Sequence, residues 1–421
     1  MTSTIAPPSS RLRYRWTICA LLFMVTTINY VDRQVLGILA PTLQREMSWS
    51  EAQYGDVVSW FSLVYAFGFL LAGRWLDRVG VRRGFATAVV VWSLAAMGHA
   101  FARTTAAFSA ARALLGLGES ANFPGGVKTV AEWFPKDERA LATGIFNAGT
   151  NTGAIITPLL VPWIALTWGW RWAFIVTGSI GFLWLFLWLA LYRSPPADAH
   201  PGEPDEPRVP PPWIRLLGVR QTWAIVVGKM LADPIWWFYL YWLPKFLDAK
   251  YGIKLAHVAL PLIVVYLVAD VGSIAGGWFS SSLIKRGWTV NRARKTAMLF
   301  MAVIIMPTAL APHAGSMWTA VAIVSVAAAA HQGWSANMYT LASDMFPRSA
   351  VASISGIGGF AGAMGGVVFQ RVTGRILDAT GNDYTLIFTV CGFAYVTAWT
   401  ILHFLAPRLE PARLSSSAST S

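Results

Sequence analysis

Residues 73–83 read Gly-Arg-Trp-Leu-Asp-Arg-Val-Gly-Val-Arg-Arg, a short basic stretch between two apolar segments at 54–74 and 84–103. A helix needs about 20 predominantly apolar residues to cross the hydrocarbon core of a bilayer, and each flanking segment has that length. Short loops rich in Lys and Arg face the cytoplasm in membrane proteins. The stretch therefore predicts two transmembrane helices joined by a cytoplasmic loop.

The same pattern continues on both sides of this loop. Apolar segments that we predict to be transmembrane helices lie at 16–36, 54–74, 84–103, 106–130, 139–163 and 171–192, and again at 221–247, 257–284, 296–312, 316–340, 349–376 and 384–406. Residues 193–220 separate the two groups and are rich in proline and charged residues, which is typical of a linker. The predicted fold is an all-α membrane protein of twelve transmembrane helices. Its parts are an N-terminal tail at 1–15, a six-helix bundle at 16–192, the linker at 193–220, a second six-helix bundle at 221–406 and a C-terminal tail at 407–421.

The composition excludes several other classes of protein. Apolar residues make up 55% of the chain and charged residues 13%, whereas about a quarter of the residues in soluble domains are charged. Two cysteines without metal-ligand spacing give no disulfide or zinc framework. The net charge of +13 lies in short loops between apolar segments, so it indicates membrane topology and not nucleic-acid binding. No small-residue cleavage site follows the first apolar segment, which we interpret as a retained helix.

The distribution of Lys and Arg also predicts the orientation. With a cytoplasmic N-terminus, the inner loops hold most of the basic residues, and both termini are cytoplasmic in a multi-pass protein of the inner (plasma) membrane. The second half carries a corresponding basic stretch at 285–295, after Gly276 and Gly277. Repeated six-helix units of this kind are expected in a transporter whose site lies near the membrane midplane between the halves.

Residues 73–83 match every fixed position of GxxxDRxGxRR, the cytoplasmic loop signature of the major facilitator superfamily, which the chain resembles. The resemblance implies a two-bundle transporter in which Asp77, with Gly73 and Arg78 of the same motif, braces the two halves and biases the gate. The alternative interpretation of Asp77 and its neighbours is a charge cluster that only sets the topology.

Further motifs resemble the anion:cation symporter branch of that superfamily, and its hexuronate transporters in particular. These motifs are Asn-Tyr-Val-Asp-Arg at 29–33, Arg-Ala-Leu-Leu-Gly-Leu-Gly-Glu-Ser-Ala-Asn-Phe-Pro at 112–124, the stretch from Lys229 to Lys245, and His-Gln-Gly-Trp-Ser-Ala-Asn at 331–337. The resemblance implies proton-driven symport of a sugar acid such as a glucuronate or galacturonate, by a monomer without cofactor or metal. It also points to Arg33 as the substrate ligand. A hexonate, dicarboxylate or aromatic acid stays open as the substrate.

Four ionisable residues lie deep in the predicted spans of the first half: Asp32, Arg33, Arg112 and Glu119. Each costs at least roughly 2.5–3.5 kcal/mol at a helix centre unless it is paired or faces water. Arginine suits a carboxylate substrate because its planar fork binds both oxygens, so Arg33 and Arg112 are candidate substrate ligands. The two acids, Asp32 and Glu119, are candidates for the coupling proton. Arg112 and Glu119 are seven residues apart and share a helix face, so we expect Arg112 to pair with the acids. The alternative is a static ionic network that holds two helices in register.

Other polar residues in the spans are weaker candidates. Tyr65 can offer a hydroxyl to the substrate, and Asn29, Asn147, Trp334 and Asn337 can bind sugar hydroxyls or stack on the ring. Each has a packing alternative, since the chain holds 22 tryptophans. The sequence leaves open whether Asp233, Asp270 or His331 takes part.

Rival functions have less support from the residues. No GxxxxGK[ST] phosphate-binding loop occurs, which argues against an ATP-driven pump. No nucleophile elbow accompanies His331, so a membrane enzyme is not expected. A uniporter would not need the acidic pair, and a sensor built on the same fold would usually carry an added soluble domain.

Overall fold

The computed structural model describes residues 8–134, 136–193, 212–346 and 348–412, and these residues contain helices and no strand. The helices of the first half are α1 (Pro8–Met47), α2 (Glu51–Val79), α3 (Val81–Gly98), α4 (Thr105–Glu119), α5 (Asn122–Trp133), α6 (Lys136–Trp168) and α7 (Trp170–Leu191). The short α8 (Trp213–Leu217) leads to α9 (Arg220–Tyr241), α10 (Leu243–Tyr251), α11 (Ala259–Lys285), α12 (Val290–Ile305), α13 (Met317–Met345), α14 (Arg348–Thr380) and α15 (Thr385–Leu405). Most of the predicted linker lies outside the described residues, and α8 lies in its final part.

The helices correspond to the twelve predicted spans. Two spans are divided into two α-helices each, and the ninth continues from α12 into a 3₁₀ helix at Met306–His313. The fourth span is divided into α4 and α5, and the seventh into α9 and α10 at Trp242. Within the described residues, seven helices are long and apolar enough to cross a membrane by length and composition alone. In the other spans polar or charged residues interrupt the apolar sequence, as Asp32 and Arg33 do in α1.

The break in the fourth span follows from Pro124. Proline has no backbone N–H, so Pro124 cannot bond the carbonyl of Ser120 four residues earlier, and its ring crowds that carbonyl. Regular hydrogen bonding resumes at Gly125, whose N–H donates to the Ala121 carbonyl at 2.9 Å. Glu119 is the last residue of α4 and therefore lies directly at the break.

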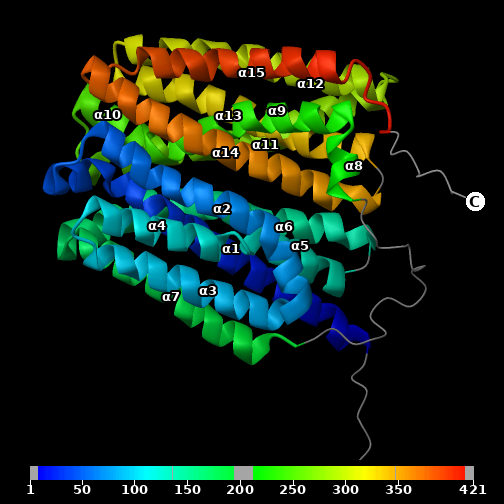
Figure 1. Ribbon diagram of the computed structural model, residues 1–421, viewed down its shortest axis with the longest axis horizontal. Helices are drawn as coiled ribbons and strands as arrows, with labels where there is room; N and C mark the ends of the chain where they lie inside the picture. The colour runs from blue at the N-terminus through cyan, green and yellow to red at the C-terminus, as the bar shows by residue number, and fades with distance from the viewer. Residues whose placement is uncertain (1–7, 135, 194–211, 347, 413–421) are drawn as a thin grey trace, which may run out of the picture.

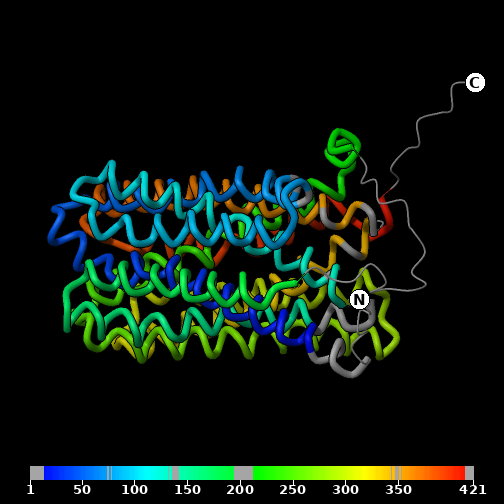
Figure 2. Tube along the Cα trace, turned by 90° about the horizontal axis from the view of Figure 1, so that it is seen from below, coloured from blue at the N-terminus to red at the C-terminus, as the bar shows by residue number. Residues whose placement is uncertain are grey.

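The two halves lie side by side as two bundles, α1–α7 in blue to green and α9–α15 in green to red (Figure 1). Figure 2 shows the same bundles after a quarter turn, with the helices running along one common direction. Across the boundary, α2 packs on α14 and α6 packs on α11. The α2–α14 contact is close because Gly55 faces the Gln370 backbone and Gly374 faces the Glu51 backbone, where a Cβ would not fit.

Candidate functional site

A buried ion pair between Arg33 of α1 and Glu119 of α4 is the centre of the site. Nε of Arg33 donates to Oε2 of Glu119 at 2.8 Å, and Nη2 forms an ion pair with the same oxygen at 2.8 Å. The two side chains are 3% and 0% exposed. Arg33 Nη2 also donates to Oδ1 of Asn29 at 3.3 Å. The second carboxylate oxygen of Glu119 has no hydrogen-bond partner among the described residues. The guanidinium fork is thus occupied by one acid.

Aromatic rings surround the Arg33 guanidinium. Its Cζ lies 4.7 Å from the ring centroid of Tyr30 and 4.9 Å from those of Phe61 and Tyr65. Such rings stabilise a cation through their negative faces and exclude water from it. The predicted site residues Arg33, Asn29 and Tyr65 are therefore brought together with Glu119 in one place.

Among the described residues Arg112 forms an ion pair with no acid, contrary to the expectation from its helix face. It is fully buried, and its Nη1 donates to the backbone carbonyl of Arg33 at 3.4 Å. Its Cζ lies 4.8 Å from the Phe61 ring centroid and 5.4 Å from that of Tyr241 in the second half. Seven residues of α-helix separate Arg112 from Glu119 by about 10 Å along the axis, too far for direct pairing, and Arg33 takes the carboxylate instead.

Asp32 points away from its neighbour Arg33, as adjacent helical residues must. The residue is 1% exposed, and Thr177 of α7 is a polar neighbour. Neither carboxylate oxygen has a hydrogen-bond partner within the described part of the chain. An ionised carboxylate is expensive to bury without a partner. Asp32 is thus a second acid in the first half, separate from the Arg33–Glu119 pair.

The structure does not bring Trp334 or Asn337 to this site, which corrects their assignment to the substrate. Trp334 is buried in the second half with its ring 5.5 Å from that of Tyr395. The Asn337 amide donates to the backbone carbonyls of Gly276 and Gly333 at 3.2 and 2.9 Å. The bond to Gly276 holds α13 against α11, so the residue has a packing role in this conformation.

The remaining candidate residues lie in different parts of the molecule. Asn147 is exposed on α6. His331 bonds the Tyr395 hydroxyl at 2.5 Å and stacks on Trp236 at 5.3 Å, within the second half. Asp270 of α11 interacts with Asn151 of α6, across the boundary of the halves.

The loop motif is only partly described. The side chain of Asp77 lies outside the described residues, so its brace role stays a prediction. Arg78 is exposed near the end of α2. A Cβ at Gly73 would meet no atom within 4 Å, so no close packing explains that glycine.

Sequence reasoning missed Lys229, which pairs with Asp233. Lys229 Nζ lies 2.8 Å from Asp233 Oδ2, four residues further along α9. The signal that could have found it was a basic and an acidic residue at i, i+4 inside an apolar span.

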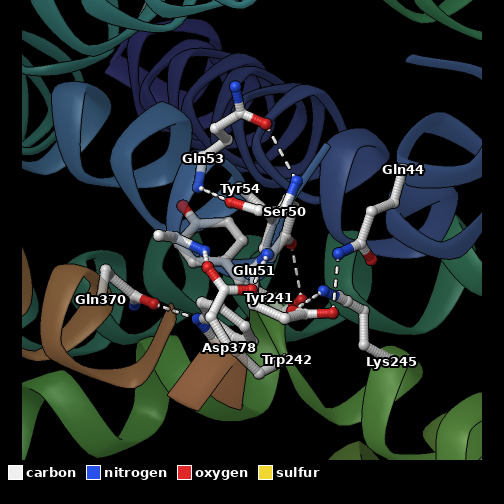
Figure 3. A network of polar contacts seen from close by, with 11 residues as sticks. Gln44, Ser50, Glu51, Gln53, Tyr54, Tyr241, Trp242, Lys245, Gln370 and Asp378 are labelled. Atoms are coloured by element: carbon white, nitrogen blue, oxygen red, sulfur yellow. Dashed lines mark hydrogen bonds and ion pairs between the residues drawn. The ribbon is translucent and has the colours of Figure 1, made fainter. Parts of the chain in front are cut away.

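A polar network closes one end of the molecule, which the charge distribution predicts to be extracellular and which we call the outer end (Figure 3). The Asp378 carboxylate of α14 accepts hydrogen bonds from the backbone N–H groups of Glu51 and Ala52 at 2.7 and 2.8 Å, so it caps α2 of the other half. Glu51 also pairs with Lys245 of α10. The Tyr54 hydroxyl donates to the Tyr241 carbonyl at 2.7 Å. The two halves are therefore joined at this end.

Comparison with known proteins matches these features to a family. The sequence profile described as Major Facilitator Superfamily matches residues 22–370. A hexuronate transporter of Escherichia coli K12 is 30% identical over 408 residues, which cover 92% of this chain and 94% of that protein. A D-galactonate transporter of Escherichia coli O6:H1 is 28% identical, with 89% and 92% covered, and a galacturonate transporter of Dickeya chrysanthemi is 31% identical, with 66% and 84% covered.

Solved structures agree on the fold. A D-xylose–proton symporter superposes with a TM-score of 0.75 at 15% identity, over 96% of this chain and 100% of that one. A bacterial homologue of the human lysosomal transporter Spinster, inward-facing and unoccupied, gives a TM-score of 0.73 at 17% identity over 96% of both chains. The chain belongs to the major facilitator superfamily, as a multi-pass membrane transporter similar to the sugar-acid carriers of the anion:cation symporter branch.

Proposed function

We propose that this transporter imports a sugar acid, a hexuronate or a close relative, together with protons. Three relatives that are named as sugar-acid transporters match most of this chain, and the buried arginine supplies the counter-charge that a carboxylate needs. The observation that carries the proposal is the Arg33–Glu119 pair, in which both donors of the fork engage one acid at 2.8 Å.

This pair couples the substrate anion to a proton through competition for Arg33. While Glu119 is ionised it occupies the fork, so a substrate carboxylate cannot form both charge-assisted hydrogen bonds. Protonating Glu119 weakens its hold on Arg33 and frees the fork for the incoming carboxylate. The site then gains one negative and one positive charge together, which avoids an uncompensated charge in a place of low dielectric.

Asp32 is the second proton site in this proposal. It is buried without a hydrogen-bond partner among the described residues, and its neighbour in the chain is the substrate-binding arginine. A neutral Asp32 removes the cost of an unpaired buried charge. The proton gradient supplies the driving force, and no cofactor takes part. The carrier acts as a monomer in the inner membrane, with both termini in the cytoplasm.

In the alternating-access cycle that we propose, the carrier changes to a state that is open at the outer end. In that state the two halves contact each other at the cytoplasmic end instead. In the present conformation Asp378 and Lys245 join the halves at the outer end, so substrate entering from outside must first separate these contacts. Asp77, near the C-terminal end of α2, would set the balance between the two states.

Two measurements test the proposal. A thermal-shift panel of hexuronates, hexonates, dicarboxylates and aromatic acids on the purified protein identifies the substrate class; stabilisation by sugar acids is expected, and stabilisation by aromatic acids alone would contradict the proposal. Addition of the bound acid to proteoliposomes should then raise the internal proton concentration, whereas an uncoupled uniporter would transport without this change.

A further inference from the structure

One face of α9 carries three residues that the mechanism above does not use. Lys229, Asp233 and Trp237 are spaced at i, i+4 and i+8, so they lie above one another on the helix. The Trp237 ring lies 6.2 Å from Phe61 and 6.1 Å from Tyr65, both on α2 of the first half. Those two rings also contact the Arg33 guanidinium. This face of α9 is therefore continuous with the aromatic wall of the Arg33 site.

Three glycines of α14 oppose these three residues one for one. A Cβ at Gly358 would lie 2.8 Å from the Lys229 Cδ, one at Gly362 would overlap the Asp233 carboxylate, and one at Gly366 would lie 2.9 Å from the Trp237 ring. The glycines thus keep the space beside the Lys229–Asp233 pair clear of side chains from α14. Replacing any of them would force the opposing residue to move.

The Lys229–Asp233 pair is largely buried, but solvent still reaches part of it. Its side chains are 8% and 25% exposed, and the Lys229 Nζ lies 4.7 Å from the ring centroid of Tyr339 on α13. Tyr339 interacts electrostatically with Tyr30 and Tyr65 of the first half, and it is nevertheless 61% exposed. The Tyr339 ring thus borders the Lys229–Asp233 pair and is accessible to solvent. An ion pair inside an apolar span is expensive, and residues kept in such positions usually mark a substrate or ion path.

We propose that Lys229 and Asp233 bind the end of the substrate remote from the carboxylate on Arg33, and that Asp233 selects acids with one carboxylate over those with two. This inference rests on the proposed function and assigns its second subsite. Asp233 neutralises Lys229, so the pair offers a donor and an acceptor without net charge, which suits sugar hydroxyls. A second carboxylate at this place would face the negative charge of Asp233.

The test compares galactonate with galactarate, two open-chain acids that differ only in whether the remote end is a hydroxymethyl group or a carboxylate. Binding of each is measured by isothermal titration on the full-length protein and on Asp233→Asn, which keeps the shape of the side chain and removes its charge. We expect the ratio of the galactonate Kd to the galactarate Kd to rise at least about tenfold, the factor that corresponds to about 1.4 kcal/mol.

Two further variants separate this role from a structural one. In Lys229→Gln/Asp233→Asn neither charge remains. The preference for galactonate should then fall below that of the wild type, because the repulsion by Asp233 is gone. It should fall less than in Asp233→Asn, where Lys229 also attracts the second carboxylate. Asp344→Asn, which removes an acid paired with Arg294 at 3.2 Å elsewhere in the second half, should leave the ratio as in the wild type.

The outcomes are distinguishable. An unchanged ratio in a folded Asp233→Asn protein overturns the second subsite while leaving the proposed function intact. If Asp233→Asn does not fold, the neutral double variant decides, because its wild-type preference for galactonate should fall, and an unaltered preference overturns the inference. A wild-type protein that binds no sugar acid in the panel overturns the proposed function, and this inference with it.

Discussion

Removing the Arg33 guanidinium should abolish substrate binding. The contacts of Arg33 in the structure indicate how much the Kd should rise and which double variant is needed as a control. The fork gives the substrate two charge-assisted hydrogen bonds, each contributing roughly 1.5–3 kcal/mol. Losing both in Arg33→Ala should raise the Kd at least about a hundredfold. Arg33→Lys should recover little of this loss, since an ammonium is a point charge without the planar fork.

The same substitution also leaves Glu119 buried without its partner. Breaking a buried ion pair from one side costs roughly 3–5 kcal/mol, because the remaining charge is uncompensated. The Arg33→Ala protein should therefore show a lower thermal transition than the wild type. Arg33→Ala/Glu119→Gln, in which no charge is left alone, should recover much of that stability and still fail to bind.

The assay is isothermal titration of the acid identified in the thermal-shift panel, with melting curves recorded on the same preparations. The double variant makes the result interpretable, since it separates lost binding from lost folding. A Kd near the wild-type value in Arg33→Ala/Glu119→Gln would refute the assignment of Arg33 as the substrate ligand.

Two other predictions concern the equilibrium between the inward-open and outward-open states. Asp77→Asn should slow uptake into proteoliposomes with little change in Kd, because it alters the balance of states and not the site; a loss of affinity equal to that of Arg33→Ala would contradict this. Asp378→Ala removes the cap that the second half provides to α2, worth roughly 0.5–2 kcal/mol, and should shift the carrier towards a state open at the outer end. Distances between spin labels on the two halves at that end should lengthen in Asp378→Ala, whereas substitution of the exposed Arg408 should leave them unchanged.

Much of the fold could be predicted because the bilayer imposes simple rules on a sequence. The segment lengths and the basic loops need only local composition, and the twelve predicted spans correspond to the helices found. The predicted boundaries missed the break after Glu119, although Pro124 carries the signal for it. The orientation of the termini stays a prediction from charge.

The sequence predicts which ionisable residues form the site, but it does not predict which of them pair with one another. Ionisable side chains in apolar spans stood out, so Asp32, Arg33, Arg112 and Glu119 were all found. Their partners depend on how helices far apart in the chain pack, and Arg33 and Glu119 are 86 residues apart. Helix periodicity relates residues within one helix, which led to the incorrect expectation that Arg112 pairs with the acids.

Contacts between the halves could not be predicted for the same reason. The carboxylate that caps α2 belongs to Asp378, 327 residues from Glu51, and no local pattern links them. The residue types and the motif at 331–337 favour Trp334 and Asn337 as substrate ligands, whereas α11 and α15 bury them in the second half.

The central claim is that Glu119 carries the proton that couples to the substrate anion through Arg33. The direct measurement is uptake of labelled substrate into proteoliposomes containing Glu119→Gln, run once with unlabelled substrate inside and once with only an inward proton gradient. The carboxamide mimics the protonated acid, so exchange should persist while gradient-driven accumulation is lost. Asp32→Asn should likewise retain exchange and lose gradient-driven accumulation. Its exchange should be weaker, because the substitution disturbs the neighbouring Arg33. Full pH-driven accumulation by Glu119→Gln would contradict the claim and leave the Arg33–Glu119 pair as a structural ion pair.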